Sequence, residues 1–380
     1  MKIALVSPYD IAQPGGVSDH ITHLRSEFTH LGYETVVLAP RARKGGLEVG
    51  EGFYGVGRPI AIPSNGSTAR LTFDVTLYAA VKALMRRERF DVVHVHEPLV
   101  PVLPYMVLLN SGATNIATFH AFRQSSAWYT ALKPYMNLLL SRLDARIAVS
   151  GPALEFVSQY FEGPYEVIPN GIDVARFLDP EPMPWAADGR PRILFVGRFS
   201  EPRKGFKYLL RAMPLIHQQF PEARLVVVGT GRPEKYAGLM ERYGIANVDF
   251  VGHVPFAELP RYYASCDVFC APSVARESFG IVLLEAMAAG KPVVAGDNPG
   301  YASVLTHGRE GLLARPKDEQ ALALALVRLL ADAGLRRQFG AWGRASAGRY
   351  DWPLVARRVL DLYDRAARTT DPPPRLRGFA

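Results

Sequence analysis

Two glutamates, Glu277 and Glu285, stand where a predicted strand gives way to a predicted helix. Glu277 would lie at the mouth of the helix and Glu285 about two turns inside it. Eight helical residues advance roughly 12 Å at ~1.5 Å each, which is comparable with the reach from the ribose to the sugar of a nucleotide-sugar. The helix N-terminus at Phe279 and Gly280 lies between the two carboxylates and suits phosphate groups. Because Glu285 has apolar neighbours in the sequence, its carboxylate needs a hydrogen-bonding partner.

Two further strand-to-helix junctions carry residues that could bind an anion. Arg198 follows the strand expected at 192–196, and Lys204 precedes the next helix. Together they supply roughly two positive charges, which would match a diphosphate, although a solvated basic loop is the alternative. Gly15 and Gly16 follow the first strand and would let a phosphate or sugar approach the backbone, but such a turn is more often structural. The absence of G-x-G-x-x-G here argues against a nicotinamide or flavin enzyme.

Histidines gather near the ends of two other predicted strands. His94 and His96 alternate on one strand beside Glu97, which raises the question of a metal site. No third ligand has an obvious spacing, so we expect buried or cleft-lining histidines instead. His120 ends a strand at the edge where doubly wound sheets bind ligands and is a functional candidate. The chain has no Asp-x-Asp motif, so we expect no metal at the phosphate site.

The elements that must position these residues alternate along the whole chain. Short runs of Val, Ile and Leu are separated by amphipathic segments, a pattern typical of parallel α/β domains. At 380 residues, with 48% apolar and 21% charged side chains, the chain fits two domains. No run of residues is long and apolar enough for a spanning helix, and the N-terminus resembles a buried strand more than a signal peptide. We therefore expect a cytoplasmic protein whose two cysteines, Cys266 and Cys270, fill the core. The twelve expected strands are 2–7, 34–39, 92–96, 116–119, 146–149, 166–168, 192–196, 224–228, 248–251, 268–271, 292–295 and 311–313.

Taken together, the motifs resemble those of the retaining glycosyltransferase family 4. The two glutamates precede Ala-Met-Ala-Ala-Gly-Lys-Pro-Val-Val, and the chain also carries Gly15-Gly16-Val17, Gly197-Arg198, Arg203-Lys204-Gly205 and Ile168-Pro169-Asn170-Gly171. The resemblance runs from residue 1 to about 365. It implies the GT-B fold: two Rossmann-like doubly wound domains facing a central cleft, and a C-terminal helix that crosses back to the first domain. The implied division is an acceptor domain at 1–170, a donor domain at 171–350, the crossover helix at 351–368 and a disordered tail at 369–380.

Within the family, the likeness is strongest to bacterial phosphatidylinositol mannosyltransferases. It rests on Ser7-Pro8-Tyr9, on the segment from Ile62 to Leu71, on Phe90 to Pro98, and on Glu201 to Gly205. The resemblance implies that Glu277 contacts the transferred sugar, Glu285 the ribose, and His120 the reacting centre. Tyr9, Asn65 and Arg70 would bind the acceptor. The donor would be held by Gly16, Arg198, Lys204, Glu277, Ser278, Phe279, Gly280 and Glu285.

The implied reaction moves mannose from GDP-mannose to the inositol ring of a phosphoinositide lipid, with no cofactor and no metal. The loop at 253–259 has only one carboxylate, Glu258, that could pair with guanine, so the preference for a GDP donor rests on the resemblance and not on these residues. A UDP-sugar donor, with diacylglycerol or a soluble inositol phosphate as acceptor, stays open, as does a sugar-nucleotide epimerase or a non-catalytic binding protein. The net charge of +8 favours an anionic membrane surface at the inner face of the cell membrane as partner, and we expect no nucleic acid. The residues that would contact the membrane are the basic Arg86, Arg87 and Arg89 and the apolar Leu77, Tyr78 and Leu84.

Overall fold

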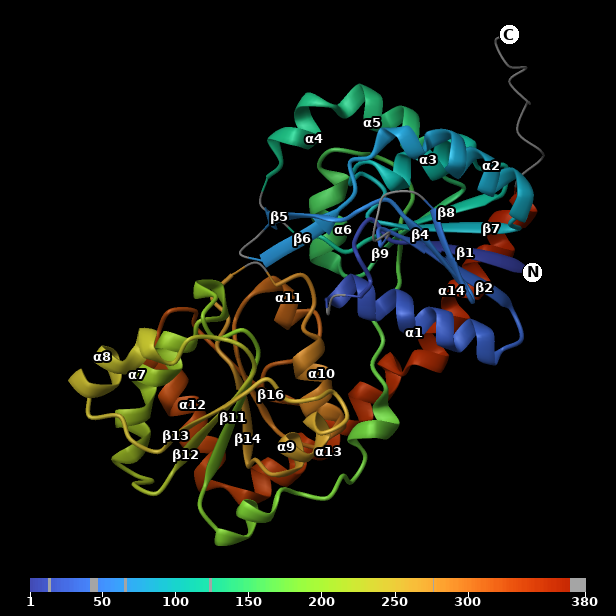
Figure 1. The fold of residues 1–380 in the computed structure, drawn as a ribbon. Helices are drawn as coiled ribbons and strands as arrows, with labels where there is room; N and C mark the ends of the chain where they lie inside the picture. The colour runs from blue at the N-terminus through green and yellow to red at the C-terminus, as the bar shows by residue number, and fades with distance from the viewer. Residues whose placement is uncertain (13–14, 42–46, 65–66, 123–124, 276, 370–380) are drawn as a thin grey trace. The chain divides into compact units, whose positions relative to one another are not determined.

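The computed structural model describes residues 1–12, 15–41, 47–64, 67–122, 125–275 and 277–369. The chain divides into two compact units: residues 1–170 with 352–380, called unit 1, and residues 171–351, called unit 2. Each unit has its own twisted sheet between helices, so the two-domain α/β fold predicted from the sequence is confirmed (Figure 1). Asn65 and the tail beyond Thr369 lie outside the described residues, while Thr369 itself ends a helix instead of beginning the tail.

Unit 1 is built on an eight-stranded sheet with the order β10-β9-β8-β7-β1-β2-β4-β3. All neighbours pair in parallel except β3 and β4, which form an antiparallel hairpin at one edge. The strands are β1 (Lys2–Val6), β2 (Glu34–Ala39), β3 (Leu47–Gly50), β4 (Phe53–Val56), β7 (Val92–His96), β8 (Thr114–Phe119), β9 (Ala145–Ala148) and β10 (Glu166–Val167). A separate antiparallel hairpin joins β5 (Ile60–Ser64) and β6 (Ser67–Leu71).

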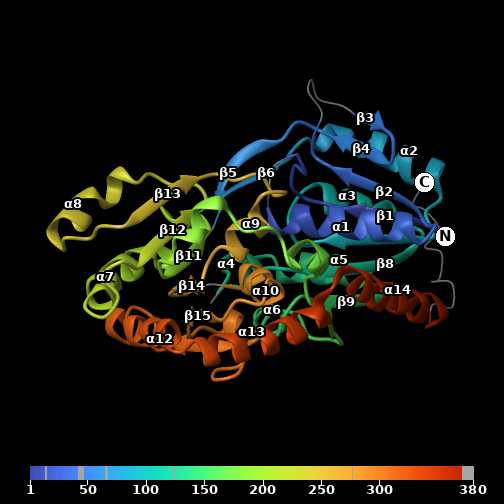
Figure 2. The same cartoon turned by 90° about the horizontal axis from the view of Figure 1, so that it is seen from below.

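The helices of unit 1 cover both faces of its sheet. Ile3 and Leu5 face a cluster that includes α1 and α14, whereas Ala4 and Val6 face one that includes α2 and α3. The C-terminal helix α14 thus lies beside α1, and both figures show the two helices together (Figures 1 and 2). The helices are α1 (Gly16–His30), α2 (Tyr78–Glu88), α3 (Leu103–Asn110), α4 (Ala127–Ala131), α5 (Lys133–Leu140), α6 (Gly151–Ser158) and α14 (Trp352–Thr369).

Unit 2 repeats this architecture with a six-stranded, all-parallel sheet in the order β13-β12-β11-β14-β15-β16. The strand order reverses between β11 and β14, where doubly wound folds bind ligands. The strands are β11 (Arg192–Val196), β12 (Arg224–Val228), β13 (Val248–Gly252), β14 (Val268–Ala271), β15 (Val293–Gly296) and β16 (Gly311–Ala314). The helices are α7 (Phe206–His217), α8 (Glu234–Arg242), α9 (Leu259–Ala264), α10 (Ile281–Ala288), α11 (Pro299–Ala302), α12 (Glu319–Ala331) and α13 (Ala333–Ala347).

Successive residues of β11 point to opposite faces of this sheet. Ile193 packs in the cluster under α7 and α12, and Leu194 packs in the cluster with α9 and α10. Cys266 and Cys270 are both free and buried in these clusters, which confirms their predicted place in the core. None of the helices in the described part of the chain combines the length and hydropathy of a membrane-spanning segment.

All twelve strands expected from the sequence are present, and the structure adds β3 to β6. These four lie between β2 and α2, in a stretch rich in Gly and Pro that shows no continuous apolar run. Antiparallel hairpins at an edge or outside the main sheet do not need to be buried on both faces. The signal that identified the parallel strands is therefore weak in these four.

Candidate functional site

In unit 2, the loop after β11 is held against the loop after β14. Gly205 has a φ of +70°, and a Cβ at this position would lie 1.9 Å from the carbonyl oxygen of Pro272. Only glycine permits this close approach without a clash. The backbone N–H of Val274 and the Oγ of Ser273 both donate to the carbonyl oxygen of Arg203, at 2.8 and 2.9 Å. Two stretches more than sixty residues apart in sequence are thus locked together at the switch point.

Glu277 is the meeting point of these two loops. Its Oε1 accepts from the hydroxyl of Ser273 at 2.7 Å, from Lys204 Nζ at 2.9 Å and from Arg203 Nη1 at 3.0 Å. The residue is only 9% exposed. Burial alone would raise the pKa of its carboxyl, but the charges of Lys204 and Arg203 and the Ser273 hydroxyl outweigh burial and hold the pKa below its usual value. Glu277 is therefore an ionised, fixed acceptor with two cations beside it.

A second carboxylate extends this ion-pair chain to Arg198. Glu201 lies 2.8 Å from Arg198 Nε and 2.9 Å from Arg203 Nε, and its side chain is only 9% exposed. Arg198 itself is about half exposed. The series of ion pairs runs from Arg198 through Glu201 and Arg203 to Glu277. With Lys204 included, this network has three positive and two negative side chains. An anion arriving at this edge would meet cations that are already oriented by their partners.

The helix α10 begins beside this network. Gly280, with a φ of +138°, is its N-cap and offers no side-chain cap to the first N–H groups. Phe279 is buried with its ring 5.9 Å from that of Tyr350, and Ser278 is half-buried. The positive end of the helix dipole and uncapped N–H groups make this terminus suited to phosphate.

Glu285 lies within α10 and is 6% exposed. Its Oε2 accepts a hydrogen bond of 2.7 Å from the hydroxyl of Tyr263 on α9. Burial, followed by the adjacent carboxylate of Glu285, raises the pKa of Tyr263 well above its usual value, so the phenol keeps its proton as a donor. The sequence indicated that Glu285 needs a partner, and Tyr263 is that partner.

In unit 1, the loop after β1 lies against β6. The N–H of Asp10 donates to the carbonyl oxygen of Arg70 at 3.0 Å, and the Ser7 hydroxyl donates to the carbonyl oxygen of Tyr9 at 2.9 Å. Tyr9 is half-buried, and Arg70 is exposed. At Gly16, where α1 begins, a Cβ would meet no atom within 4 Å. Tyr9, Arg70 and the start of α1 thus belong to one rim of the unit 1 sheet.

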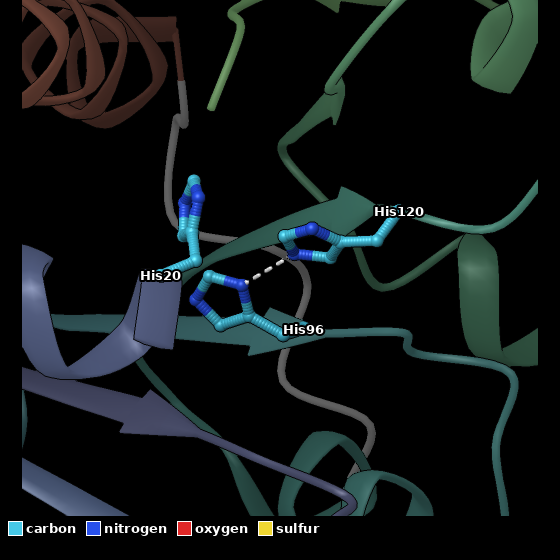
Figure 3. Close-up of side chains that lie close together, drawn as sticks. All are labelled: His20, His96 and His120. Carbon is cyan, nitrogen blue, oxygen red and sulfur yellow. Dashed lines mark hydrogen bonds between the residues drawn. The ribbon is translucent and has the colours of Figure 1, made fainter. Parts of the chain in front are cut away.

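Three histidines of unit 1 come together from different elements: His20 on α1, His96 at the end of β7 and His120 just after β8 (Figure 3). All three are buried. His96 Nδ1 lies 3.0 Å from His120 Nε2, and His20 Nδ1 lies 2.9 Å from the Oδ1 of Asn170. Burial lowers the pKa of His20 to about 4 and the pKa values of His96 and His120 well below the usual range. The three rings are therefore neutral at physiological pH.

The remaining histidine of this strand has a supporting role. The two ring nitrogens of His94 form hydrogen bonds of 2.6 Å, Nδ1 with the hydroxyl of Tyr363 and Nε2 with the hydroxyl of Thr118. Burial lowers the pKa of His94 to about 3. Glu97, at a φ of +48°, accepts from the N–H groups of His120 and Ala121 at 2.6 and 2.7 Å. These bonds fix the backbone that carries His120.

The structure brings most of the predicted residues into two groups, one in each unit. Glu277 and Lys204 are in direct contact, and the ion pairs of Glu201 and Arg203 connect Arg198 to them. Sequence reasoning did not single out Ser273, Arg203 or Tyr263 as site residues. Arg203 lies within the run from Glu201 to Gly205 that carried the family resemblance, so its signal was present. Ser273 and Tyr263 lack such a signal, because their part depends on contacts between elements.

One expectation about the surface needs revision. Leu77 and Leu84, expected to help an exposed stretch contact lipid, are buried in the core under α2, with 8% and 1% exposure. Leu84 on α2 and Leu77 in the short 3-10 helix just before it (Val75–Leu77) both face the core, whereas Tyr78 and Arg86 are exposed. Glu258, considered as a partner for guanine, is exposed and lies 3.3 Å from Arg261.

Comparison with known proteins places both units in one enzyme family. Residues 14–176 match the model described as Glycosyltransferase Family 4, and residues 190–332 match that of Glycosyl transferases group 1. The chain is 37% identical over 375 residues to a phosphatidyl-myo-inositol mannosyltransferase of Mycobacterium tuberculosis, covering 97% of each chain. A protein of the same name from Mycolicibacterium smegmatis is 35% identical, over 96% of this chain and 94% of the relative.

Solved structures agree on the fold. Sucrose-phosphate synthase from Thermosynechococcus elongatus superposes with a TM-score of 0.76 at 24% identity, covering 97% of this chain and all of that chain. HepE of Anabaena, solved in complex with UDP, superposes with a TM-score of 0.75 at 21% identity, over 96% of this chain and all of that chain. The predicted GT-B fold is thus confirmed. Because the mannosyltransferase relatives are 35–37% identical over 96–97% of its length, the chain belongs to glycosyltransferase family 4 and is a glycosyltransferase.

Proposed function

We propose that this enzyme transfers mannose from GDP-mannose to the inositol ring of phosphatidylinositol, with retention of configuration at the sugar carbon. The observation that carries the proposal is Glu277, an ionised carboxylate held by Ser273, Arg203 and Lys204 at the N-terminal end of α10. The mannosyltransferase relatives, similar over nearly the whole length of both chains, supply the sugar and the acceptor class. No cofactor is needed, because the nucleotide itself is the leaving group.

On the donor side, each charged residue has one task. Lys204 and Arg198 neutralise the diphosphate, and the uncapped N–H groups at the start of α10 add hydrogen bonds to it. Glu277 accepts hydrogen bonds from the sugar hydroxyls, and Glu285, oriented by Tyr263, accepts from the ribose.

In the reaction, the bond between the sugar carbon and the β-phosphate oxygen breaks while the inositol oxygen bonds to the same face of the sugar. The inositol hydroxyl passes its proton to the β-phosphate oxygen that departs, and GDP leaves with its remaining negative charge stabilised by Lys204 and Arg198. Because these cations are already in place, no metal is required at the phosphates. His120, neutral and fixed by the bonds of Glu97, contributes hydrogen bonding without charge.

On the acceptor side, Tyr9 packs on the inositol ring, and Asn65 and Arg70 bind its hydroxyls and phosphate. Arg70 is exposed and its backbone is tied to the loop that carries Tyr9, which supports one shared acceptor site. The enzyme works at the inner face of the cell membrane as a peripheral protein. Exposed Arg86 and Arg87 at the end of α2 are the residues that meet anionic lipid.

The proposal is tested by calorimetry against GDP-mannose, UDP-glucose, GDP and UDP, followed by incubation of the preferred donor with phosphatidylinositol vesicles. We expect GDP-mannose to bind and its mannose to appear on the lipid. Preferred binding of UDP-glucose would assign the enzyme to a UDP-sugar reaction instead. Conversion of the donor alone, with no acceptor present, would identify an epimerase or a hydrolase.

A further inference from the structure

The cluster of His20, His96 and His120 contains more coordinating nitrogen than its hydrogen bonds use. One ligand nitrogen from each ring lies within 4.8 Å of those of the other two, and the three rings approach from three different elements (Figure 3). Their centroids are 4.9 to 5.3 Å apart. The residues are buried, with exposures of 4%, 0% and 8%.

The hydrogen bonds of the cluster hold its protons in two places and leave one buried nitrogen without a partner. His20 Nδ1 faces the amide oxygen of Asn170, so this nitrogen carries the proton and Nε2 keeps a lone pair. His96 Nδ1 and His120 Nε2 share a single proton across 3.0 Å. The remaining nitrogen of His96, Nε2, is buried without a hydrogen-bond partner. A buried polar atom left unpaired in this way costs about 1–3 kcal/mol.

We propose that His20, His96 and His120 form a binding site for a divalent transition-metal ion, with Zn²⁺ as the preferred occupant. Zn²⁺ binds three histidine nitrogens at ~2.0–2.1 Å, which in tetrahedral geometry places the nitrogens about 3.4 Å apart. The His96 and His120 nitrogens are already 3.0 Å apart, so small ring rotations would bring His20 into the same set. Each ring keeps one proton and offers its other nitrogen, so the ring that donates in the present hydrogen bond moves its proton to its second nitrogen.

The surroundings resemble those of built metal sites. Histidine ligands usually donate their other N–H to a fixed oxygen, and Asn170 serves His20 in this way. Glu97 fixes the backbone at His120 through its bonds to two N–H groups. His94, although its ring is 4.3 Å from that of His96, has partners for both nitrogens and is a support instead of a ligand. The three ligands leave a fourth position for water, as in open zinc sites.

This site is separate from the donor phosphates, for which the charges of unit 2 make a metal unnecessary. Its consequence for activity rests on the proposed function. If His120 contacts the reacting centre, a metal ion on its nitrogen removes that contact, so Zn²⁺ would inhibit transfer. The ion would therefore regulate the enzyme and would not assist the reaction.

The test begins with protein stripped by chelator and desalted, which is titrated with Zn²⁺ against a chromophoric competitor. We expect one ion per chain, and Co²⁺ in its place should give the visible absorption of a tetrahedral nitrogen site. His20→Asn should weaken Zn²⁺ binding at least tenfold relative to His30→Asn, a matched control at the exposed end of the same helix. Asn170→Ala, which removes no ligand, should weaken it by about 10–100-fold.

Melting curves establish whether each variant is folded. If His20→Asn does not fold, the comparison is made with Asn170→Ala instead. Absence of stoichiometric Zn²⁺ binding by the parent protein, or equal affinity in His20→Asn, Asn170→Ala and His30→Asn, would overturn the proposal and leave a hydrogen-bonded histidine core. Affinity is measured without substrate, so failure of the mannosyl-transfer assay would count against the proposed function alone. If mannosyl transfer is observed, Zn²⁺ should inhibit the parent protein and His30→Asn at lower concentrations than it inhibits Asn170→Ala and His20→Asn.

Discussion

Replacing Glu277 by Gln isolates the charge of the central carboxylate while keeping its shape. In the present structure, one oxygen of Glu277 accepts from Ser273, Arg203 and Lys204. The amide keeps one acceptor oxygen but loses the negative charge that balances both cations. A charged hydrogen bond realised in the transition state contributes on the order of 2–4 kcal/mol, or about 10²–10³ in rate. We therefore expect kcat for mannosyl transfer to fall by that factor.

Nucleotide binding should respond differently. Glu277 neutralises Lys204 and Arg203 in the protein without donor, so its loss leaves more positive potential for a diphosphate. GDP affinity, measured by calorimetry, should stay within a few fold of the parent value or rise slightly. The split between rate and affinity distinguishes a sugar contact from a general loss of the site.

A buried carboxylate outside the site provides the control. Glu310 is 2% exposed and accepts from Ser346 and from the N–H of Thr306, so Glu310→Gln should lower the melting temperature without reducing the transfer rate per folded molecule. Near-normal turnover by Glu277→Gln would refute the role given to this residue. A rate loss that follows the melting temperature equally in both variants would show that the effect is one of stability.

Four other predictions follow from the same contacts. Lys204→Ala should weaken GDP binding by about 10–100-fold, since a charged hydrogen bond contributes ~1.5–3 kcal/mol, whereas Lys207→Ala on the exposed side of α7 should not; equal effects would contradict this. Chelator should leave transfer intact, and a complete loss restored by Mg²⁺ would show that the phosphates need a metal. Glu88, whose pKa is lowered to about 2 chiefly by its bond to Lys2, stabilises the fold above pH 4.5 and loses that effect toward pH 2. Glu88→Gln should therefore cost about 1–2 kcal/mol at pH 7, with the difference shrinking below pH 4.5 in denaturant titrations, and a pH-independent difference would refute the ion pair. Arg86→Glu should reduce binding to anionic vesicles roughly tenfold at low salt, given ~1 kcal/mol per basic residue, while Arg337→Glu in unit 2 should have no effect if α2 is the contact.

The parallel strands and the ligand-binding edges were predictable from the sequence for a clear reason. Each buried strand is a continuous apolar run, and the candidate residues lie in the segments that follow such runs, as Arg198 follows β11 and His120 follows β8. Position at the carboxyl end of a parallel strand fixes the edge on which a side chain emerges. Chain order alone thus assigned Glu277, Lys204 and His120 to ligand-binding edges.

The contacts within those edges were not predictable in the same way. Ser273 reaches Glu277 only because Gly205 allows two loops to touch, and Tyr263 reaches Glu285 from a different helix. The grouping of His96 with two other histidines could not be predicted from the sequence for the same reason. Its neighbours in space, His20 and His120, are far from it in sequence, so the spacing of His94 and His96 contained no trace of them. Side-chain partners across elements depend on packing, which no local pattern encodes.

The two sheets have similar strand orders, but their ligand-binding edges differ in charge. This difference indicates which substrate each unit is suited to bind. At the unit 2 edge, Arg198, Arg203 and Lys204 outnumber Glu201 and Glu277. At the unit 1 edge, the buried histidines are neutral and the carboxylate of Glu97 is satisfied by backbone N–H groups. A diphosphate gains most where fixed cations exceed anions, whereas a polyhydroxyl ring needs neutral donors and acceptors more than charge. We therefore propose that the donor nucleotide binds to unit 2 and the acceptor ring to unit 1, and the charges of the two edges support this assignment.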